Sequence, residues 1–209
     1  FYDGDLKEFS ALAFKDGKVI DVYSDTTFTE NTQTTVIDGD GKVLLPGLID
    51  AHGHVMGLGF QQMNANLVGT QSLDEAQKRV EEYAANYPDV NWIQGRGWNH
   101  THWDIGRFPT AEELDEIVSD RPVWLSRVDG HAGWANSKAM EMAGITAETE
   151  DPEGGKIIRD ENGEPTGVFV DAAMSLVSSE IPEPTQQEQK IAFRKALEQM
   201  RSHGLTGVH

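Results

Sequence analysis

The first 45 residues alternate short apolar runs with turn residues. Two pairs of runs flank Asp-containing turns: 11–14 and 19–22 around Asp16-Gly17, and 34–37 and 43–45 around 38–41. Asp-Gly steps between β-rich runs are a strong short-range hairpin signal, because the tight turns that join such strands need positive φ angles. The pattern therefore predicts two hairpins that form a small β domain or β layer over residues 1–45.

After Pro46 the pattern changes to alternating strands and helices. The helices are predicted from apolar residues at helical spacing and from starts such as Ser72 with Glu75, where a capping box satisfies free backbone groups. An Asn162-Gly163 turn predicts a β-hairpin near residues 155–170, inserted between the alternating units. The other predicted strands are 48–55, 92–95, 122–128 and 205–209, and the predicted helices begin at Ser72, Thr110, Asn136 and Thr185. The series predicts an α/β fold that breaks off at the start of a strand.

The charge balance limits the classes of partner. With 35 acidic and 17 basic residues among 209, the formal net charge is -18, which argues against binding to nucleic acid or to anionic membrane surfaces. No apolar run approaches the roughly 18 residues that a membrane span needs. The polar opening stretch 1–5 does not resemble a signal peptide, so the compartment stays open between the cytoplasm and, if a leader was removed, the periplasm.

The chain contains no cysteine, so a metal site would have to use histidine and carboxylate ligands, which suit zinc and similar divalent ions. His52 and His54 are two residues apart near the end of the predicted strand 48–55, so both side chains are expected on one face. An open catalytic site needs at least one further protein ligand and a water molecule. Two imidazoles on one face can hold a divalent ion, but the spacing alone is weak evidence for a metal site.

The residues around this pair have a more specific resemblance. The run from Leu45 to His54, LPGLIDAHGH, resembles the start of the barrel in the amidohydrolase superfamily, where a Pro-Gly-hydrophobic-hydrophobic-Asp-x-His-x-His segment follows a β domain. Further segments resemble the amidohydrolase-3 branch, which includes N-substituted formamide deformylases; they are 97–99, 108–110, 129–131, 134–139, 163–168 and 204–209.

The resemblance implies the N-terminal part of a TIM-like (β/α)8 metallohydrolase barrel, preceded by strands of a small β-sandwich domain. Residues 1–45 would belong to the sandwich and residues 46–209 to the first part of the barrel, with strands 48–55, 122–128 and 205–209 as its first barrel strands. The rest of the barrel would lie outside this sequence, because such a barrel typically needs about 250 residues.

The resemblance also implies a function. One or two divalent ions, usually zinc, would be bound by His52 and His54 and would activate water for hydrolysis of a non-peptide carbon–nitrogen bond, in an amide or an N-acyl or N-formyl amine. The later ligands and the general base have no counterpart here. The expected partner is a small-molecule substrate, and a homo-oligomer is compatible with the sequence. The alternative is a catalytically inactive relative that acts as a small-molecule binding or regulatory protein.

Other candidate site residues follow predicted strands. Asp129 and His131 follow the strand 122–128, where they would act at the barrel mouth as catalytic or substrate-positioning groups; the alternative is a turn that caps the next helix. Trp98 and Asn99 are expected to wall the substrate pocket. Arg127 would pair with a substrate carboxylate or, equally, form a structural ion pair.

Three further histidines and one acid have competing interpretations. His100-x-His102 repeats the spacing of the metal pair, but it lies in a polar loop, so a surface or pocket-lining loop is favoured. His203 is expected in the last turn of a helix, where a cation interacts favourably with the helix dipole. Asp171 either bridges two metal ions, where the resemblance often has an acid, or caps the following helix.

Overall fold

The structure, a computed structural model, describes residues 7–25 and 34–209. The opening stretch 1–5 lies outside the described residues. The chain divides into two compact units, residues 1–51 with 204–209, and residues 52–203. Across the described ranges, none of the helices combines the length and the hydrophobicity of a membrane span. The domain boundary predicted at residue 45 stays a prediction.

The first unit begins with the predicted hairpin. Strand β1 (Ala11–Lys15) pairs antiparallel with β2 (Lys18–Tyr23), and both turn residues have positive φ, 53° at Asp16 and 74° at Gly17. Asp and Gly tolerate this conformation better than other residues, so the turn sequence fixes the position of the hairpin.

The second predicted hairpin does not form. Residues 34–45 contain only a turn, in which Asp38 Oδ1 accepts a hydrogen bond from the Asp40 backbone N–H at 2.8 Å. The apolar residues of this segment are largely solvent-exposed, with Ile37 at 76% and Val43 at 82%. The prediction from the turn residues was wrong because strands also need a layer against which their apolar face packs.

The same unit contains one parallel strand pair. Strand β3 (Leu48–Asp50) pairs with β10 (Leu205–Val208), which confirms the strand predicted at residue 205. A side chain at Gly47 would overlap Thr206, so glycine is needed where the two segments approach. The strand predicted over residues 48–55 is wrong beyond Asp50. Its last pairing is Asp50 with Val208, and residues 51–54 are irregular before helix α1 begins at Val55.

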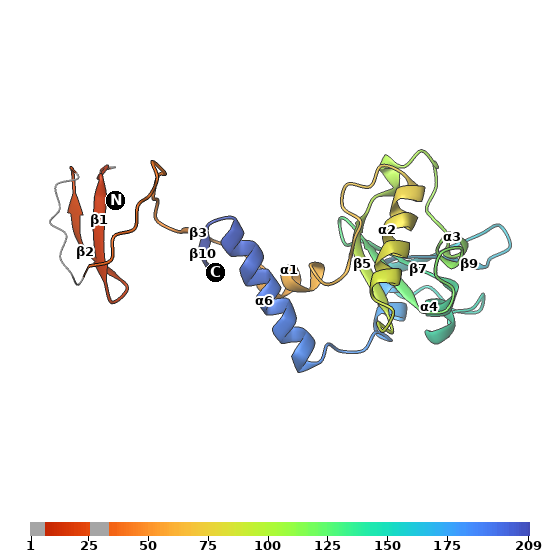
Figure 1. Cartoon of the computed structure of the whole chain (residues 1–209). Helices are drawn as coiled ribbons and strands as arrows, with labels where there is room; N and C mark the ends of the chain where they lie inside the picture. The colour runs from red at the N-terminus through yellow and green to blue at the C-terminus, as the bar shows by residue number, and fades with distance from the viewer. Residues whose placement is uncertain (1–6, 26–33) are drawn as a thin grey trace. The chain divides into compact units, whose positions relative to one another are not determined.

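The second unit is built on a six-stranded sheet with the order β4-β5-β6-β7-β9-β8 (Figure 1). Strands β4, β5 and β6 are parallel, and β7, β9 and β8 continue the sheet antiparallel. The strands are β4 (Ala65–Asn66), β5 (Ile93–Trp98), β6 (Val123–Arg127), β7 (Ala132–Ala135), β8 (Gly155–Arg159) and β9 (Pro165–Asp171). The predicted hairpin at 155–170 is observed as β8 and β9.

One strand lies in a different sheet from the one expected. The strand predicted at 122–128 forms as β6, but it pairs with β5 and β7 rather than joining β3 and β10 as a barrel strand. The sequence pattern identifies a buried strand, but it does not identify the neighbours of that strand. Within the described residues the fold is mixed α/β, and no sheet closes into a barrel.

The described residues contain six α-helices. They are α1 (Val55–Gln61), α2 (Leu73–Asn86), α3 (Ala111–Asp115), α4 (Ser137–Met142), α5 (Ser175–Ser178) and α6 (Gln186–Ser202), with 3-10 turns at His100–His102 and Ala172–Met174. The predicted caps are present: Ser72 Oγ accepts from Glu75 N at 3.1 Å, and Thr185 with Glu188 forms a capping box. Helices α1 and α6 pack closely, since a side chain at Gly59 would overlap the Ala192 backbone.

Apolar residues cover both faces of the central strands. Helix α2 lies across one face (Figure 1), where its buried residues Ala76, Val80 and Ala84 belong to the same core as Ile93 and Leu125. A second core lies on the opposite face of the sheet and contains Trp92, Trp124 and Phe169 with Ala173 and Val177. Parallel strands need this two-sided cover, and here it gives a rigid base for the loops at the ends of β5 and β6.

Candidate metal centre and the Asp129 loop

The two predicted metal ligands lie together between β3 and α1. The ring centres of His52 and His54 are 5.0 Å apart and the rings are nearly perpendicular, at 84°. Both residues are exposed. His54 is the N-cap of α1, and its backbone carbonyl accepts the Leu58 N–H at 2.9 Å. The helix start therefore fixes the backbone of His54, whereas the prediction had relied on a continuous strand.

This separation fits a shared ion. A zinc–nitrogen bond of about 2.0–2.1 Å at tetrahedral angles puts the centres of two imidazole ligands roughly 5 Å apart. Imidazole is also a donor that zinc prefers. Among the described residues, no group of three or more His, Asp or Glu side chains is arranged to hold a metal ion. The pair would supply two ligands, and a complete site would need others.

A second cluster lies in the loop after β6. Arg127 donates to both carboxylate oxygens of Asp129, from Nε to Oδ1 at 2.9 Å and from Nη2 to Oδ2 at 2.6 Å. Asp129 Oδ1 also accepts the His131 backbone N–H at 3.0 Å. These contacts, chiefly the Arg127 hydrogen bond, lower the pKa of Asp129 to about 2. Arg127 therefore forms the structural ion pair that was one of its two predicted roles, and Asp129 holds the turn that presents His131.

His131 has a carboxylate partner from another strand. Its Nδ1 lies 2.8 Å from Asp171 Oδ1, and its backbone carbonyl accepts the Asp171 N–H at 3.0 Å. Asp171 occupies the N-cap position of the 3-10 turn that follows β9, but its side chain makes no capping hydrogen bond. Its backbone has φ 49° and ψ -122°, a conformation that residues other than glycine rarely adopt. The carboxylate thus orients His131, and its role as a metal ligand stays a prediction.

The two predicted pocket-wall residues differ in exposure. Trp98 is fully buried, and its indole Nε1 donates to the Leu125 carbonyl at 2.7 Å, which ties β5 to β6. Asn99 is partly buried, and its Oδ1 caps the 3-10 turn by accepting from the Thr101 backbone at 3.3 Å and from the Thr101 hydroxyl at 2.8 Å. Both side chains have structural contacts here, and their role in substrate binding stays a prediction.

The two residues of the second His-x-His pair differ in burial, since His100 is partly buried and His102 is exposed. The His100 ring packs against Phe108, with ring centres 4.3 Å apart, and its Nδ1 is buried without a hydrogen-bond partner in the described structure. Burial, assisted by the nearby Arg127 charge, lowers the pKa of His100. His102 is exposed. The two histidines therefore lie in one loop, but their side chains do not form a cluster.

Asn136 has a larger structural role than its sequence position as a helix N-cap indicates. It is completely buried, and its side chain makes four hydrogen bonds of 2.9 Å, accepting from Val123 N and Ala139 N and donating to the Val118 and Arg121 carbonyls. The sequence signal was its position as a helix N-cap. That signal indicates the bond to Ala139 but not the bonds that fix the start of β6. Asn136 supports the strand from which the Asp129 loop extends.

Comparison with known sequences gives one family. A family model described as "Amidohydrolase family" matches residues 35–209. Protein LONG AFTER FAR-RED 3 from Arabidopsis thaliana is 38% identical over 208 residues, which cover 99% of this chain and 36% of that protein. N-substituted formamide deformylase from Arthrobacter pascens is 38% identical over 146 residues, which cover 69% of this chain and 27% of that protein. The chain thus spans about a third of the length of these relatives.

A solved structure shares the fold. An uncharacterized metal-dependent hydrolase from Pyrococcus horikoshii OT3 matches with a TM-score of 0.57 and 26% sequence identity. The match covers 78% of this chain and 30% of the hydrolase. The mixed α/β arrangement described above therefore corresponds to part of a larger metal-dependent hydrolase.

Proposed function

Because the chain belongs to the amidohydrolase family, we propose that the full-length protein is a metal-dependent hydrolase of carbon–nitrogen bonds other than peptide bonds. The proposed substrate is an amide or an N-acyl or N-formyl amine. The observation that carries the proposal is the family match over residues 35–209, a range that includes His52, His54 and the Asp129 loop. The proposed barrel would be completed by parts of the protein beyond the described residues.

The relatives support the chemistry in different ways. The formamide deformylase supports cleavage of a C–N bond in an N-formyl amine. The Pyrococcus hydrolase supports metal dependence. Since each match covers less than a third of the relative, the activity of the whole protein is proposed by similarity.

We propose that His52 and His54 bind one divalent ion, most simply zinc. When bound, such an ion polarises the substrate carbonyl and lowers the pKa of a coordinated water toward 7. Imidazole nitrogens provide lone pairs for such an ion, and the 5.0 Å separation of the two ring centres suits this role. A second ion would need ligands besides this pair.

His131 is the proposed positioning and proton-transfer group. Asp171 engages its Nδ1, which leaves Nε2 as the ring atom available to a substrate. Asp129 remains ionised at neutral pH and accepts a hydrogen bond from the backbone N–H of His131. This contact fixes the backbone position from which the His131 ring extends. General acid–base groups need this kind of orientation, because proton transfer requires a heavy-atom distance of roughly 2.6–3.2 Å.

The test is hydrolysis of a simple N-substituted formamide by the full-length protein. We expect turnover that a chelator abolishes and zinc restores. His131→Ala should reduce kcat/KM by about 100-fold while metal content stays unchanged, as expected for loss of a proton-transfer group. Turnover that survives complete metal removal would contradict the proposal. Metal binding without hydrolysis of any amide would favour the alternative of a catalytically inactive small-molecule binding protein.

A further inference from the structure

A pocket of about 290 Å³ lies on the sheet face opposite α2. Its floor comes from β5 and β6, where Gln94 pairs with Trp124 and Arg96 pairs with Ser126. Because paired residues of parallel strands lie side by side, these four side chains form one continuous surface. Helix α1 contributes Gln61 and α5 contributes Ser178 to the walls.

The charge of this pocket differs from that of the protein. Arg96 is the one charged residue among the twelve that line it, and within the described part of the chain no Asp or Glu does so. A protein with 35 acidic residues in 209 would place about two among twelve at random. The polar remainder is neutral, made of amide and hydroxyl groups. In a chain with a net charge of -18, an acid-free pocket around one arginine favours a small anion.

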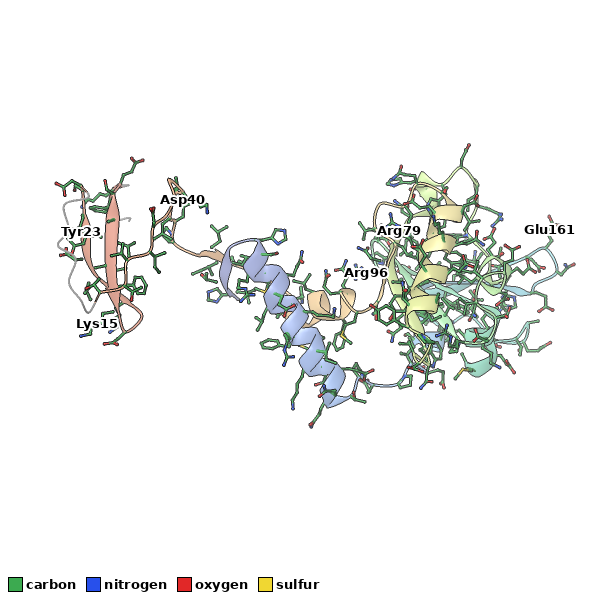
Figure 2. All side chains as sticks on the ribbon, viewed as in Figure 1. Lys15, Tyr23, Asp40, Arg79, Arg96 and Glu161 are labelled. Atoms are coloured by element: carbon green, nitrogen blue, oxygen red, sulfur yellow. The ribbon has the colours of Figure 1, made fainter. Side chains whose placement is uncertain are left out.

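Most N–H groups of the Arg96 guanidinium are available to a ligand. Arg96 is exposed near the end of β5 (Figure 2), and Nη2 donates to the Val128 carbonyl at 3.2 Å. Among the described residues, its other N–H groups have no acceptor. An arginine fork matches the two oxygens of a carboxylate, and the hydroxyls of Ser126 and Ser178 are additional donors.

The pocket borders the loop that carries the proposed proton-transfer group. Arg96 contacts the backbone of Val128, and its Nη2 lies 3.9 Å from the position of a Cβ at Gly130. A carboxylate bound at Arg96 would therefore leave the remainder of a ligand beside the turn that presents His131. Arg96 was not identified from the sequence, because nothing in its local pattern distinguishes it from a solvated arginine on a strand.

We propose that this pocket binds the carboxylate of the substrate, so that the substrate class is an amide with a carboxylate group, such as an N-formyl amino acid. The proposal rests on the proposed hydrolase function for the identity of the scissile bond. It does not rest on that function for the binding of the carboxylate. A single arginine with neutral donors suits a monoanion better than a phosphate dianion, whose second charge would lack a partner.

The first experiment measures binding without turnover. Acetate is titrated into the full-length protein and followed by ligand-observed NMR, in the wild type, in Arg96→Gln and in the matched control Arg194→Gln. Arg194 is exposed on α6 and does not line the pocket. We expect Arg96→Gln to weaken acetate binding by about tenfold, as for loss of a charge-assisted contact, and Arg194→Gln to leave it unchanged. Equal affinities of the two variants, or tighter binding of inorganic phosphate than of acetate by the wild type, would overturn the proposal.

Two further variants keep the test informative if Arg96→Gln does not fold. Arg96→Lys retains the charge without the fork and should bind acetate with intermediate affinity. Ser126→Ala removes one hydroxyl and should weaken binding by about threefold. Wild-type affinity in both variants would contradict the assignment of these side chains, even if Arg96→Gln did not fold.

The second experiment compares N-formylglycine with its neutral counterpart N-formylglycinamide as substrates. We expect Arg96→Gln to raise KM for N-formylglycine by about tenfold and to leave KM for N-formylglycinamide unchanged. Hydrolysis of both with equal KM values in wild type and variant would overturn the pocket and leave the hydrolase function standing. Arg96-dependent acetate binding in a protein that hydrolyses neither compound would support the pocket and overturn the function.

Discussion

Two parallel strand pairs in this molecule have opposite surroundings. In β5 and β6, the inward residues Ile93, Val123 and Leu125 are fully buried. In β3 and β10, Leu48 is 58% and Ile49 65% exposed. Parallel sheets are generally covered on both faces, and among the described residues the first pair has this cover while the second does not. Backbone pairing of two strands therefore does not by itself mean that their apolar side chains are buried in a core.

The two pairs also support different chemistry. The segment after β3 leads to His52 and His54, the two proposed metal ligands, which are exposed and have ring centres 5.0 Å apart. The segment after β6 leads to Asp129, whose carboxylate accepts hydrogen bonds from Arg127 and His131. A metal ion can order the first pair through its bonds, whereas the second cluster is ordered by the protein itself. We therefore expect substitutions near β6 to affect stability, and substitutions at the histidine pair to affect metal binding.

The largest expected loss of stability is for Asn136→Ala. The substitution leaves two backbone N–H groups and two carbonyls without their partner in a buried site, so we expect the free energy of unfolding to fall by about 4 kcal/mol. Urea denaturation gives the value. The control is Asn86→Ala at the exposed end of α2, which should change stability by less than about 0.5 kcal/mol. Similar losses in both variants would show that the hydrogen bonds of Asn136 are not decisive.

The next prediction compares equivalent leucines in the two strand pairs. Leu125→Ala should destabilise the 209-residue chain by about 3 kcal/mol, because it creates a cavity in a closed core. Leu48→Ala should cost less than about 1 kcal/mol, because its side chain is already 58% exposed. Thermal and urea denaturation of both variants check the difference. Equal costs would contradict the contrast between the two pairs.

The smallest expected effect is the pH dependence due to Asp129. Its pKa is lowered from 3.8 to about 2, chiefly by Arg127, so its contribution to stability is present above about pH 4 and is lost as the pH falls toward 2. Since its side chain is 43% exposed, solvent screening keeps this contribution below about 1 kcal/mol.

The check is acid denaturation of the wild type and of Asp129→Asn, with Asp89→Asn as the exposed control. The difference in unfolding free energy between wild type and Asp129→Asn should be constant above pH 5 and shrink between about pH 4 and pH 2. A difference that grows on acidification would have the wrong sign for a stabilising carboxylate.

Local signals in the sequence predicted local structure well. The Asp16-Gly17 turn, the Ser72 cap and the strand at β6 are all present, because turn geometry and capping depend on residues that are close in sequence. The same signals failed at residues 34–45, where apolar residues have no layer to cover them. They also failed to assign β6 to its sheet, because strand neighbours depend on long-range packing.

The candidate site shows the same division. The proximity of His52 and His54 follows from their spacing, although a helix start rather than a strand holds His54. The contact between His131 and Asp171 joins residues 40 apart, and Arg96 is recognised as a candidate only in a pocket lined by five elements, α1, β4, β5, β6 and α5. Neither feature has a local sequence signature. The sequence can predict which residue types carry chemistry, but not which of them meet.

The most direct test of the account is metal content. The full-length protein, its His52→Ala/His54→Ala variant and its His100→Ala/His102→Ala variant are purified in parallel, and bound metal is measured by inductively coupled plasma mass spectrometry. The second variant is a matched control, because it changes the other His-x-His pair. We expect about one to two divalent ions in the wild type and in the control, and the loss of most of this metal from the first variant. Full metal content in the His52→Ala/His54→Ala variant, or an equal loss from the control, would contradict this expectation.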